Sequence, residues 1–397
     1  MAQTIVALVG ENANGILECQ SQRFLELIRP LGLEVCVLSL HDPEFPRRLT
    51  ALLESGIAFG WGYAGIGARL ATNDKNIWSH FQIPFISVLA DAPYALPRNH
   101  HVGSDWVING YIYRDWLDLQ RLHVRSGQVS AMLPMGVIAN PDRHRTPWSE
   151  RPTRLLFVKT GCDPERLRAR WQSWPIRLRH VLEDCATALA LAPPGPILAV
   201  VQDCLLAHGL ILEGSRPLLF RLLNEVDLYV RALRATAMAR ALLDLPADIV
   251  GSGWEHVQRP GARARFHPSV PAGELDARYA QAQILVNTTP NFATGAHERV
   301  LRGFAARACV ISDENAFAAS VLSQLPTHHA VDWSAADLPD RLASLLDGAA
   351  PEEGELDQAE QFTASHYDPS LFLARMAELA QIARLTPTLS GFALDAA

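Results

Sequence analysis

The residues best suited to chemistry lie in a polar loop between residues 286 and 298. An apolar run over residues 284–286 leads into this loop, and a helical pattern with Arg299 in its first turn follows it. A helix N-terminus presents unpaired backbone N–H groups and about half a positive charge, which together suit a phosphate, and Arg299 adds a charge-assisted hydrogen bond. The loop therefore predicts an anion-binding site, with an ordinary capped helix as the alternative. The candidate binding residues are Thr289, Asn291, Gly295, His297, Glu298 and Arg299.

Two carboxylates in the N-terminal third, Glu11 and Asp91, are candidates for a general base. Each follows an apolar run that predicts a strand, residues 4–9 for Glu11 and residues 85–89 for Asp91. Because a parallel sheet brings the carboxyl ends of its strands to one edge, both side chains can reach the same ligand. A base that takes a proton from the attacking group raises the rate by about 10²–10⁴-fold. The alternative for Asp91 is a turn cap before Pro93, a common role of Asp.

The elements that must position these residues alternate along the chain. The pattern predicts a parallel, doubly wound sheet, which binds ligands at the carboxyl ends of its strands. The predicted strands cover residues 4–9, 33–40, 57–61 and 85–89, and the predicted helices between them cover residues 16–31 and 46–55.

A glycine-rich segment over residues 60–65 forms another possible ligand loop. Its glycines allow a ligand to approach the backbone closely, and Trp61 and Tyr63 offer aromatic faces for a sugar or a base. A tight turn packed by Trp61 is the alternative. The loop over residues 10–15 lacks the G-x-G-x-x-G spacing, so it is only a weak indication of a dinucleotide site.

Length and composition predict two α/β domains. The chain has 397 residues, of which 49% are apolar, and this is enough for two cores. A polar, proline-bearing stretch over residues 138–147 has the character of a linker, which gives an N-terminal domain over residues 1–147 and a C-terminal domain over residues 148–369. Residues 164–245 are mostly helical with long apolar faces, and we expect them to serve packing rather than chemistry.

The net charge and the cysteines argue against two classes of protein, general nucleic-acid binders and zinc proteins. The net charge of −7 argues against a general nucleic-acid binder. Six dispersed cysteines without a C-x-x-C pair predict reduced thiols in the cytoplasm and no zinc site. No apolar run reaches the roughly 18 residues that a transmembrane helix needs, and the first residues lack the basic start of an export signal.

Several segments resemble the GT-B glycosyltransferases, most closely the CgeB-type group. In that group an Arg within a helix precedes a small-residue turn and a strand, and here Arg299 precedes residues 305–308 and an apolar run. Relatives carry a Glu three residues after the Arg and a Gly before the last strand, where this chain has Arg302 and Ala308. Arg302 takes the place of the carboxylate that usually holds the donor ribose, and Glu298 is near enough in sequence to replace it. The resemblance extends to residues 83–93, 132–137, 248–254, 266–268 and 274–280.

The resemblance implies a GT-B fold, in which two Rossmann-like doubly wound domains face an interdomain cleft. It implies that the C-terminal helix over residues 370–397 packs back on the N-terminal domain, and that the loop containing Glu11 helps to hold the acceptor. Lys159 and Thr160 would approach the donor phosphates, with a merely exposed Lys as the alternative. The implied neighbours of the nucleotide base are Gly253 and Trp254.

The function implied by the resemblance is a glycosyltransferase that moves a sugar from a nucleotide-diphosphate sugar to a nucleophile of a glycan, protein or small molecule. The sequence has no D-x-D triplet, which commonly holds a divalent cation on such a donor. We therefore expect no metal and no cofactor beyond the donor, with Lys159 and Arg299 meeting the charge of the leaving diphosphate. The alternatives are a sugar-nucleotide epimerase, which needs no acceptor, and a non-catalytic nucleotide-sugar-binding protein.

Overall fold

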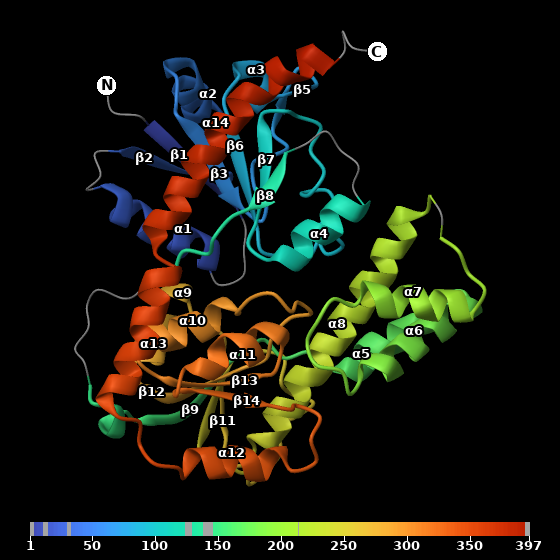
Figure 1. Ribbon diagram of the computed structural model, residues 1–397, viewed down its shortest axis with the longest axis vertical. Helices are drawn as coiled ribbons and strands as arrows, with labels where there is room; N and C mark the ends of the chain where they lie inside the picture. The colour runs from blue at the N-terminus through green and yellow to red at the C-terminus, as the bar shows by residue number, and fades with distance from the viewer. Residues whose placement is uncertain are drawn as a thin grey trace. The chain divides into compact units, whose positions relative to one another are not determined.

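Two compact units make up the computed structural model of the protein, which describes residues 4–10, 15–29, 33–123, 129–137, 146–212 and 214–393 (Figure 1). Unit 1 comprises Met1–Ile138 and Tyr367–Ala397, and unit 2 comprises Ala139–His366. Each unit contains one parallel six-stranded sheet, so the α/β class predicted from the sequence is confirmed. The division falls at the start of the stretch that the sequence indicates as a linker.

The sheet of unit 1 has the strand order β2-β1-β3-β6-β7-β8, and every neighbouring pair is parallel. The strand order reverses between β1 and β3, a place that we call the switch point of the unit and where doubly wound sheets bind ligands. A short antiparallel pair, β4 (Ala71–Thr72) and β5 (Lys75–Asn76), forms a separate sheet. The six strands are β1 (Thr4–Val9), β2 (Glu34–Ser39), β3 (Phe59–Tyr63), β6 (Phe85–Leu89), β7 (Val107–Tyr111) and β8 (Ser130–Met132).

Strand β3 runs two residues later than the sequence predicts, and Gly60 and Gly62 lie inside it. Packing requires both glycines. A Cβ on Gly60 would lie 2.7 Å from the ring of Trp78, and a Cβ on Gly62 would lie 2.2 Å from the carbonyl oxygen of Ile66. The close approach that the glycine-rich segment indicates is therefore an approach of the protein's own side chains and backbone.

The C-terminal helix, α14 (Pro369–Ala393), belongs to unit 1 although it follows unit 2 in the chain, and Figure 1 draws it in red. Its Phe372 packs edge-on against Phe24 and Trp61, with 5.1 and 6.1 Å between ring centroids. Trp61 is fully buried, so it packs the core of unit 1 and offers no face to a ligand. The other helices of the unit are α1 (Ile16–Ile28), α2 (Phe45–Ser55), α3 (Ile77–Phe81) and α4 (Arg114–His123).

The sheet of unit 2 has the order β11-β10-β9-β12-β13-β14 and is also parallel throughout. By position in the chain this is the order 3-2-1-4-5-6 of dinucleotide-binding sheets. Its switch point lies between β9 and β12, which pair directly through Leu156 and Leu285, so the loops after these two strands begin side by side. The strands are β9 (Thr153–Val158), β10 (Ala247–Val250), β11 (Arg265–His267), β12 (Ala282–Asn287), β13 (Cys309–Asp313) and β14 (His328–Val331).

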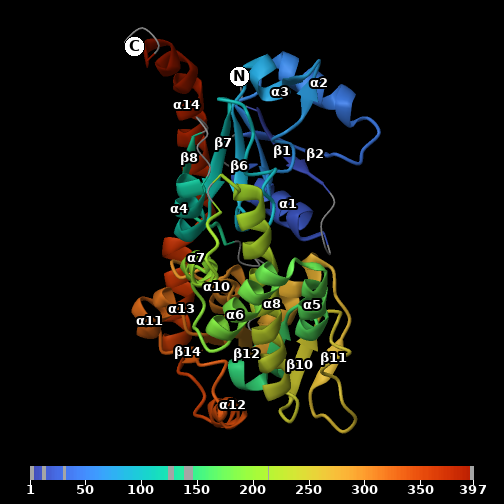
Figure 2. The same ribbon diagram turned by 90° about the vertical axis from the view of Figure 1, so that its right-hand side faces the viewer.

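A helix of 26 residues, α8 (Arg216–Ala241), joins two layers of unit 2. Its C-terminal part packs on the sheet, where Met238 and Ala239 share a core with Leu155 and Ile249. Its N-terminal part packs against α5 (Pro164–Arg170) and α6 (Ile176–Leu189), which Figure 2 shows in green beside the yellow α8. The remaining helices are α7 (Leu198–Ala207), α9 (Ala272–Ala280), α10 (Glu298–Ala305), α11 (Ala316–Ser320), α12 (Leu338–Leu346) and α13 (Glu353–His366), with short 3-10 turns at Trp148–Glu150, Trp171–Ser173 and Leu322–Gln324.

Candidate functional site

Lys159 and Arg299 lie near each other at the switch point of unit 2. The sequence analysis expects these two cations to offset the charge of the leaving diphosphate. Lys159 directly follows β9, and Arg299 lies in the first turn of α10, which is reached from β12 through the loop over residues 288–297. Lys159 is half-buried, and burial holds its pKa well below the usual range of a lysine. Arg299 and Arg231 push that pKa in the same direction, because each disfavours a second positive charge nearby.

Arg299 is held against the end of β12. Its Nε donates to Oδ1 of Asn287 at 3.0 Å, and its Nη2 donates to the carbonyl oxygen of Thr288 at 3.4 Å. Its backbone N–H donates to Nδ1 of His297, the N-cap of α10, at 3.2 Å. His297 therefore satisfies one of the unpaired N–H groups at the helix start, and its Nδ1 is the unprotonated ring nitrogen.

The electrostatic environment around His297 is positive. Burial lowers its pKa well below the usual range of a histidine, and the charged neighbours that lower it further are Arg299, Lys159 and Arg231. A neutral ring agrees with the acceptor role of Nδ1. Cations that repel one another in a partly buried place are stabilised when an anion binds between them. The positive charge at the place where the loop predicts an anion site therefore comes mainly from side-chain cations, with the helix start beside them.

Two predicted binding residues, Thr289 and Asn291, hold the loop in place. The backbone N–H of Thr289 donates to both carboxylate oxygens of Asp313, at 2.7 and 3.0 Å. The side chain of Asn291 is fully buried, accepts from Nη1 of Arg234 at 2.7 Å and donates to Oδ1 of Asp227 at 2.8 Å. These bonds inside the protein give both residues a role in holding the loop, and the donor contact expected from the sequence stays a prediction.

Gly253 and Trp254 fix the backbone that carries Lys159. The φ of Gly253 is +83°, and a Cβ there would lie 2.4 Å from the carbonyl oxygen of Gly161, so only glycine fits. The indole N–H of Trp254 donates to the carbonyl oxygen of Lys159 at 2.9 Å. Trp254 is only 1% exposed, so it supports the loop from inside and has no open face on which a base can stack.

The remaining predicted binding residues lie near the same strand end and helix start, and their role stays a prediction. Thr160 is exposed next to Lys159, while Gly295 and Glu298 are partly exposed around the start of α10. Arg302, which stands where relatives carry a Glu, is buried, forms an ion pair with Asp276 of α9 and lies 4.9 Å over the ring of Tyr279. Arg302 therefore engages a buried carboxylate that comes from α9.

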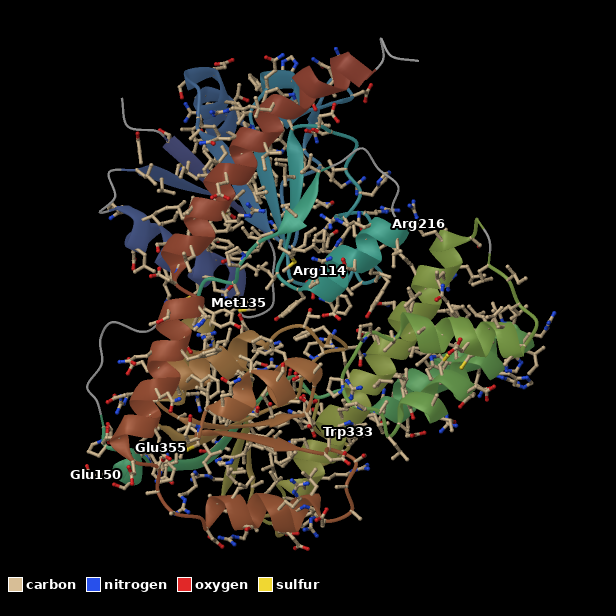
Figure 3. The ribbon with its side chains drawn as sticks, in the orientation of Figure 1. Arg114, Met135, Glu150, Arg216, Trp333 and Glu355 are labelled. Carbon is tan, nitrogen blue, oxygen red and sulfur yellow. The ribbon has the colours of Figure 1, made fainter. Side chains whose placement is uncertain are left out.

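The sequence alone does not reveal the contribution of α8. Asp227, Arg231 and Arg234 follow one another at i, i+4 and i+7, which places them on one helix face. Nη1 of Arg231 lies 3.2 Å from Oδ2 of Asp227, and the guanidinium of Arg234 lies 5.7 Å from the ring of Trp333, labelled in Figure 3. The available signal was that Asp227 and Arg234 interrupt the buried apolar stripe of the helix. We call the following residues the charged cluster: Lys159, Asp227, Arg231, Arg234, His297, Arg299 and Asp313.

Unit 1 carries a neutral polar network near the carboxyl end of β7. Nδ1 of His100 lies 2.8 Å from the hydroxyl of Tyr111, and the side-chain amides of Asn109 and Gln120 both donate to the His100 carbonyl oxygen at 2.9 Å. Burial lowers the pKa of His100 to about 3, so the ring is neutral at neutral pH. Asp91, a candidate base, is exposed and follows β6 after one residue, Ala90. The other candidate base, Glu11, lies outside the described residues.

The described ranges contain no group of three or more His, Cys, Asp or Glu side chains arranged to hold a metal ion. No helix within them is both long enough and apolar enough to cross a membrane. All six cysteines are free thiols.

Comparison with solved structures shows which fold this is. AviGT4, a glycosyltransferase involved in avilamycin A biosynthesis, matches with a TM-score of 0.50 and 15% identity over 96% of this chain and 98% of its own. Sucrose-phosphate synthase (tll1590) from Thermosynechococcus elongatus matches with a TM-score of 0.53 and 10% identity, again over 96% and 98%. The chain has the GT-B fold.

A third solved structure with the GT-B fold is an α-glucosyltransferase in complex with UDP-glucose and DNA containing an abasic site. It matches with a TM-score of 0.52 and 9% identity over 96% of this chain and all of its own. At such identities the likeness concerns the fold. No protein-family model matches the sequence, and no curated protein does.

Proposed function

We propose that this GT-B protein is a glycosyltransferase whose donor is a nucleoside-diphosphate sugar. The observation that carries the proposal is the meeting of Lys159 and Arg299 at the switch point of unit 2, where Arg231 adds to their mutual repulsion. A diphosphate brings the concentrated negative charge that such a cluster binds. The names of the solved structures support the same reading, since one of them holds UDP-glucose and another is a sucrose-phosphate synthase.

The proposed reaction breaks the bond between the anomeric carbon of the sugar and the diphosphate oxygen. The electron pair of that bond stays on the diphosphate, and the acceptor nucleophile forms the new bond to the anomeric carbon. The acceptor loses a proton to a base, for which Glu11 and Asp91 are the candidates. Negative charge grows on the diphosphate as the bond breaks, so fixed cations stabilise the transition state more than they stabilise the bound donor.

We propose further that the reaction needs no divalent cation. Lys159 and Arg299 supply positive charge where a metal ion would otherwise offset the charge of the leaving diphosphate. The expected result is full activity in EDTA. Complete loss of activity in EDTA, restored by manganese or magnesium, would show that a cation site exists.

For the acceptor and the cellular location, the proposal keeps the expectations drawn from the sequence. The acceptor is a glycan, a protein or a small molecule, and the CgeB-type resemblance defines the group of enzymes to which we assign the chain. Six free thiols favour a reducing compartment, and we propose the cytoplasm.

Turnover of sugar nucleotides separates the proposal from its alternatives. The protein is incubated with UDP-, GDP-, ADP- and dTDP-sugars, first alone and then with candidate acceptors, and the products are identified by mass spectrometry. Identification of any nucleotide that co-purifies with the protein narrows the choice of donor. A transferase releases one nucleoside diphosphate for each acceptor glycosylated. Conversion to an isomeric sugar nucleotide without acceptor would indicate an epimerase, and tight binding without turnover would indicate a non-catalytic protein.

A further inference from the structure

The connection between β9 and β10 is far longer than the fold requires. One crossover helix is enough to join two neighbouring parallel strands, yet residues 164–241 form α5, α6, α7 and α8. Of these helices, α8 packs on the sheet through residues that include Met238 and Ala239. Its middle turns, between the sheet and the outer helices, carry Asp227 and Arg231.

A continuous chain of hydrogen bonds links this part of α8 to the loop over residues 288–297. Arg231 pairs with one carboxylate oxygen of Asp227, and the other oxygen accepts from the amide of Asn291 at 2.8 Å. Arg234 donates to the same Asn291 side chain from one helical turn further on. The Asp227 and Asn291 side chains are almost fully buried, whereas the Arg231 side chain is 36% exposed. The buried members set the position of Arg231, whose side chain keeps partial access to solvent.

The charge of the leaving group exceeds what Lys159 and Arg299 offset. The diphosphate of a sugar nucleotide carries two negative charges. When the glycosidic bond breaks, a third charge develops on the terminal phosphate, whose second pKa is about 6. Arg231 lies close enough to Lys159 and His297 to act on both electrostatically.

We propose that Arg231 is a third cationic ligand of the donor diphosphate, supplied by the helical insertion, and that it meets the charge that develops on the terminal phosphate. The inference rests on the proposed function. It predicts that Arg231 affects turnover and the binding of the nucleoside diphosphate product more than the binding of the intact sugar nucleotide. It also predicts that Arg231 distinguishes nucleoside diphosphates from monophosphates, which lack the second phosphate.

The test uses Arg231→Gln, which removes the charge but keeps an amide that can donate to Asp227. Arg231→Lys restores a charge at the same place. Arg221→Gln is the matched control, because Arg221 lies on the same helix and its guanidinium stacks 4.9 Å over Trp174, outside the charged cluster. Calorimetry measures the binding of UDP, GDP and ADP, of the matching monophosphates, and of inorganic pyrophosphate, which serves as a probe free of any base. Melting temperatures confirm that each variant is folded.

The expected result is that Arg231→Gln weakens diphosphate and pyrophosphate binding by about 10- to 100-fold, as for the loss of one charge-assisted bond. Monophosphate binding should stay within about twofold, Arg231→Lys should recover part of the loss, and Arg221→Gln should bind like the unaltered protein. Equal losses for mono- and diphosphates, or equal losses in the Arg221 control, would overturn the inference. If Arg231→Gln binds diphosphates normally while Arg299→Ala does not, the role of Arg231 is refuted and the proposed function is not. If the unaltered protein binds none of the probes, both the role of Arg231 and the proposed function are refuted.

Discussion

The two units build parallel sheets of the same size but bury different kinds of polar group beside the strand ends. Unit 2 buries charged side chains, among them Arg234 and Asp313, whereas unit 1 buries a neutral network around His100 and Gln120. The neutral network carries no charge that an anion would offset. A partly buried group of mutually repelling cations is stabilised by an anion. The sheet alone therefore does not distinguish the two units, and the buried charge is our reason for proposing that the donor binds to unit 2.

The largest expected effect tests whether the proton of the acceptor goes to unit 1. Changing the responsible carboxylate to its amide, by Glu11→Gln or Asp91→Asn, should lower turnover by about 10²–10⁴-fold and leave donor affinity nearly unchanged. If Asp91 only caps its turn, Asp91→Asn should instead cost about 1 kcal/mol of stability and little turnover. Steady-state kinetics, donor calorimetry and melting temperatures distinguish these outcomes. Turnover near that of the unaltered protein in both variants would remove both residues from the mechanism.

A second test compares how much the charged network and the neutral network each contribute to the free energy of unfolding. Arg234→Leu leaves Oδ1 of Asn291 without its donor and removes a cation close to Asp227 and Asp313. Loss of one partner from such a buried charged network should lower the free energy of unfolding by about 3–5 kcal/mol.

The matched change in unit 1 is Gln120→Leu, which should cost only about 1 kcal/mol because the His100 carbonyl oxygen keeps its bond from Asn109. Urea titrations of both variants give the two values. An equal decrease in the free energy of unfolding in both variants would mean that the charged network stabilises the fold no more than the neutral one.

A third, smaller effect concerns donor affinity. Arg299→Ala should weaken the binding of a nucleoside diphosphate by roughly 1.5–3 kcal/mol, the range for a charge-assisted bond, while the fold stays intact. Calorimetry with the preferred nucleotide measures the change, and Arg221→Gln again controls for the overall loss of positive charge. Unchanged affinity in Arg299→Ala would refute the assignment of this residue to the donor site.

The smallest effect is a pH dependence caused by Lys159. Because its pKa in the folded protein is depressed, the folded protein binds fewer protons than the unfolded chain between that value and the usual value of about 10.4. The contribution of Lys159 to the free energy of unfolding therefore rises with pH across this window. A bound diphosphate favours the charged amine, so affinity should be highest below the depressed pKa. It should fall by at most tenfold per pH unit as the pH rises through that pKa.

Lys159→Met provides the check on this pH dependence. Its diphosphate affinity should be weak and nearly independent of pH above about pH 7.5, where the second phosphate ionisation, with a pKa of about 6, is complete. Calorimetry at a series of pH values compares it with the unaltered protein. The same slope in both proteins would show that another group titrates.

Local sequence patterns were sufficient to predict the class of fold and to single out two of the four Lys and Arg side chains in the charged cluster. Alternating apolar runs predicted the strands, and Lys159 and Arg299 were singled out because each follows a strand, directly or after a polar loop, as the structure shows. Parallel strands must end at one edge, so residues that follow them are brought together whatever the rest of the chain does. The same patterns placed β3 two residues too early, because glycines that packing requires inside a strand have the same composition as a loop.

Only the tertiary structure decided which side chains of the loops face inward and which distant residues join them. Asn291 had the composition of a ligand-binding loop residue, but its amide is occupied by Arg234 and Asp227, which are 57 and 64 residues away in the sequence. Arg231 lies on the same face of α8 as Asp227 and Arg234, in a segment in which the sequence indicated no chemistry. Periodicity and turn chemistry act over a few residues and determine where an element begins and ends. The partner of a buried polar group depends on which elements come into contact, and that contact is made only when the sheet and α8 pack together.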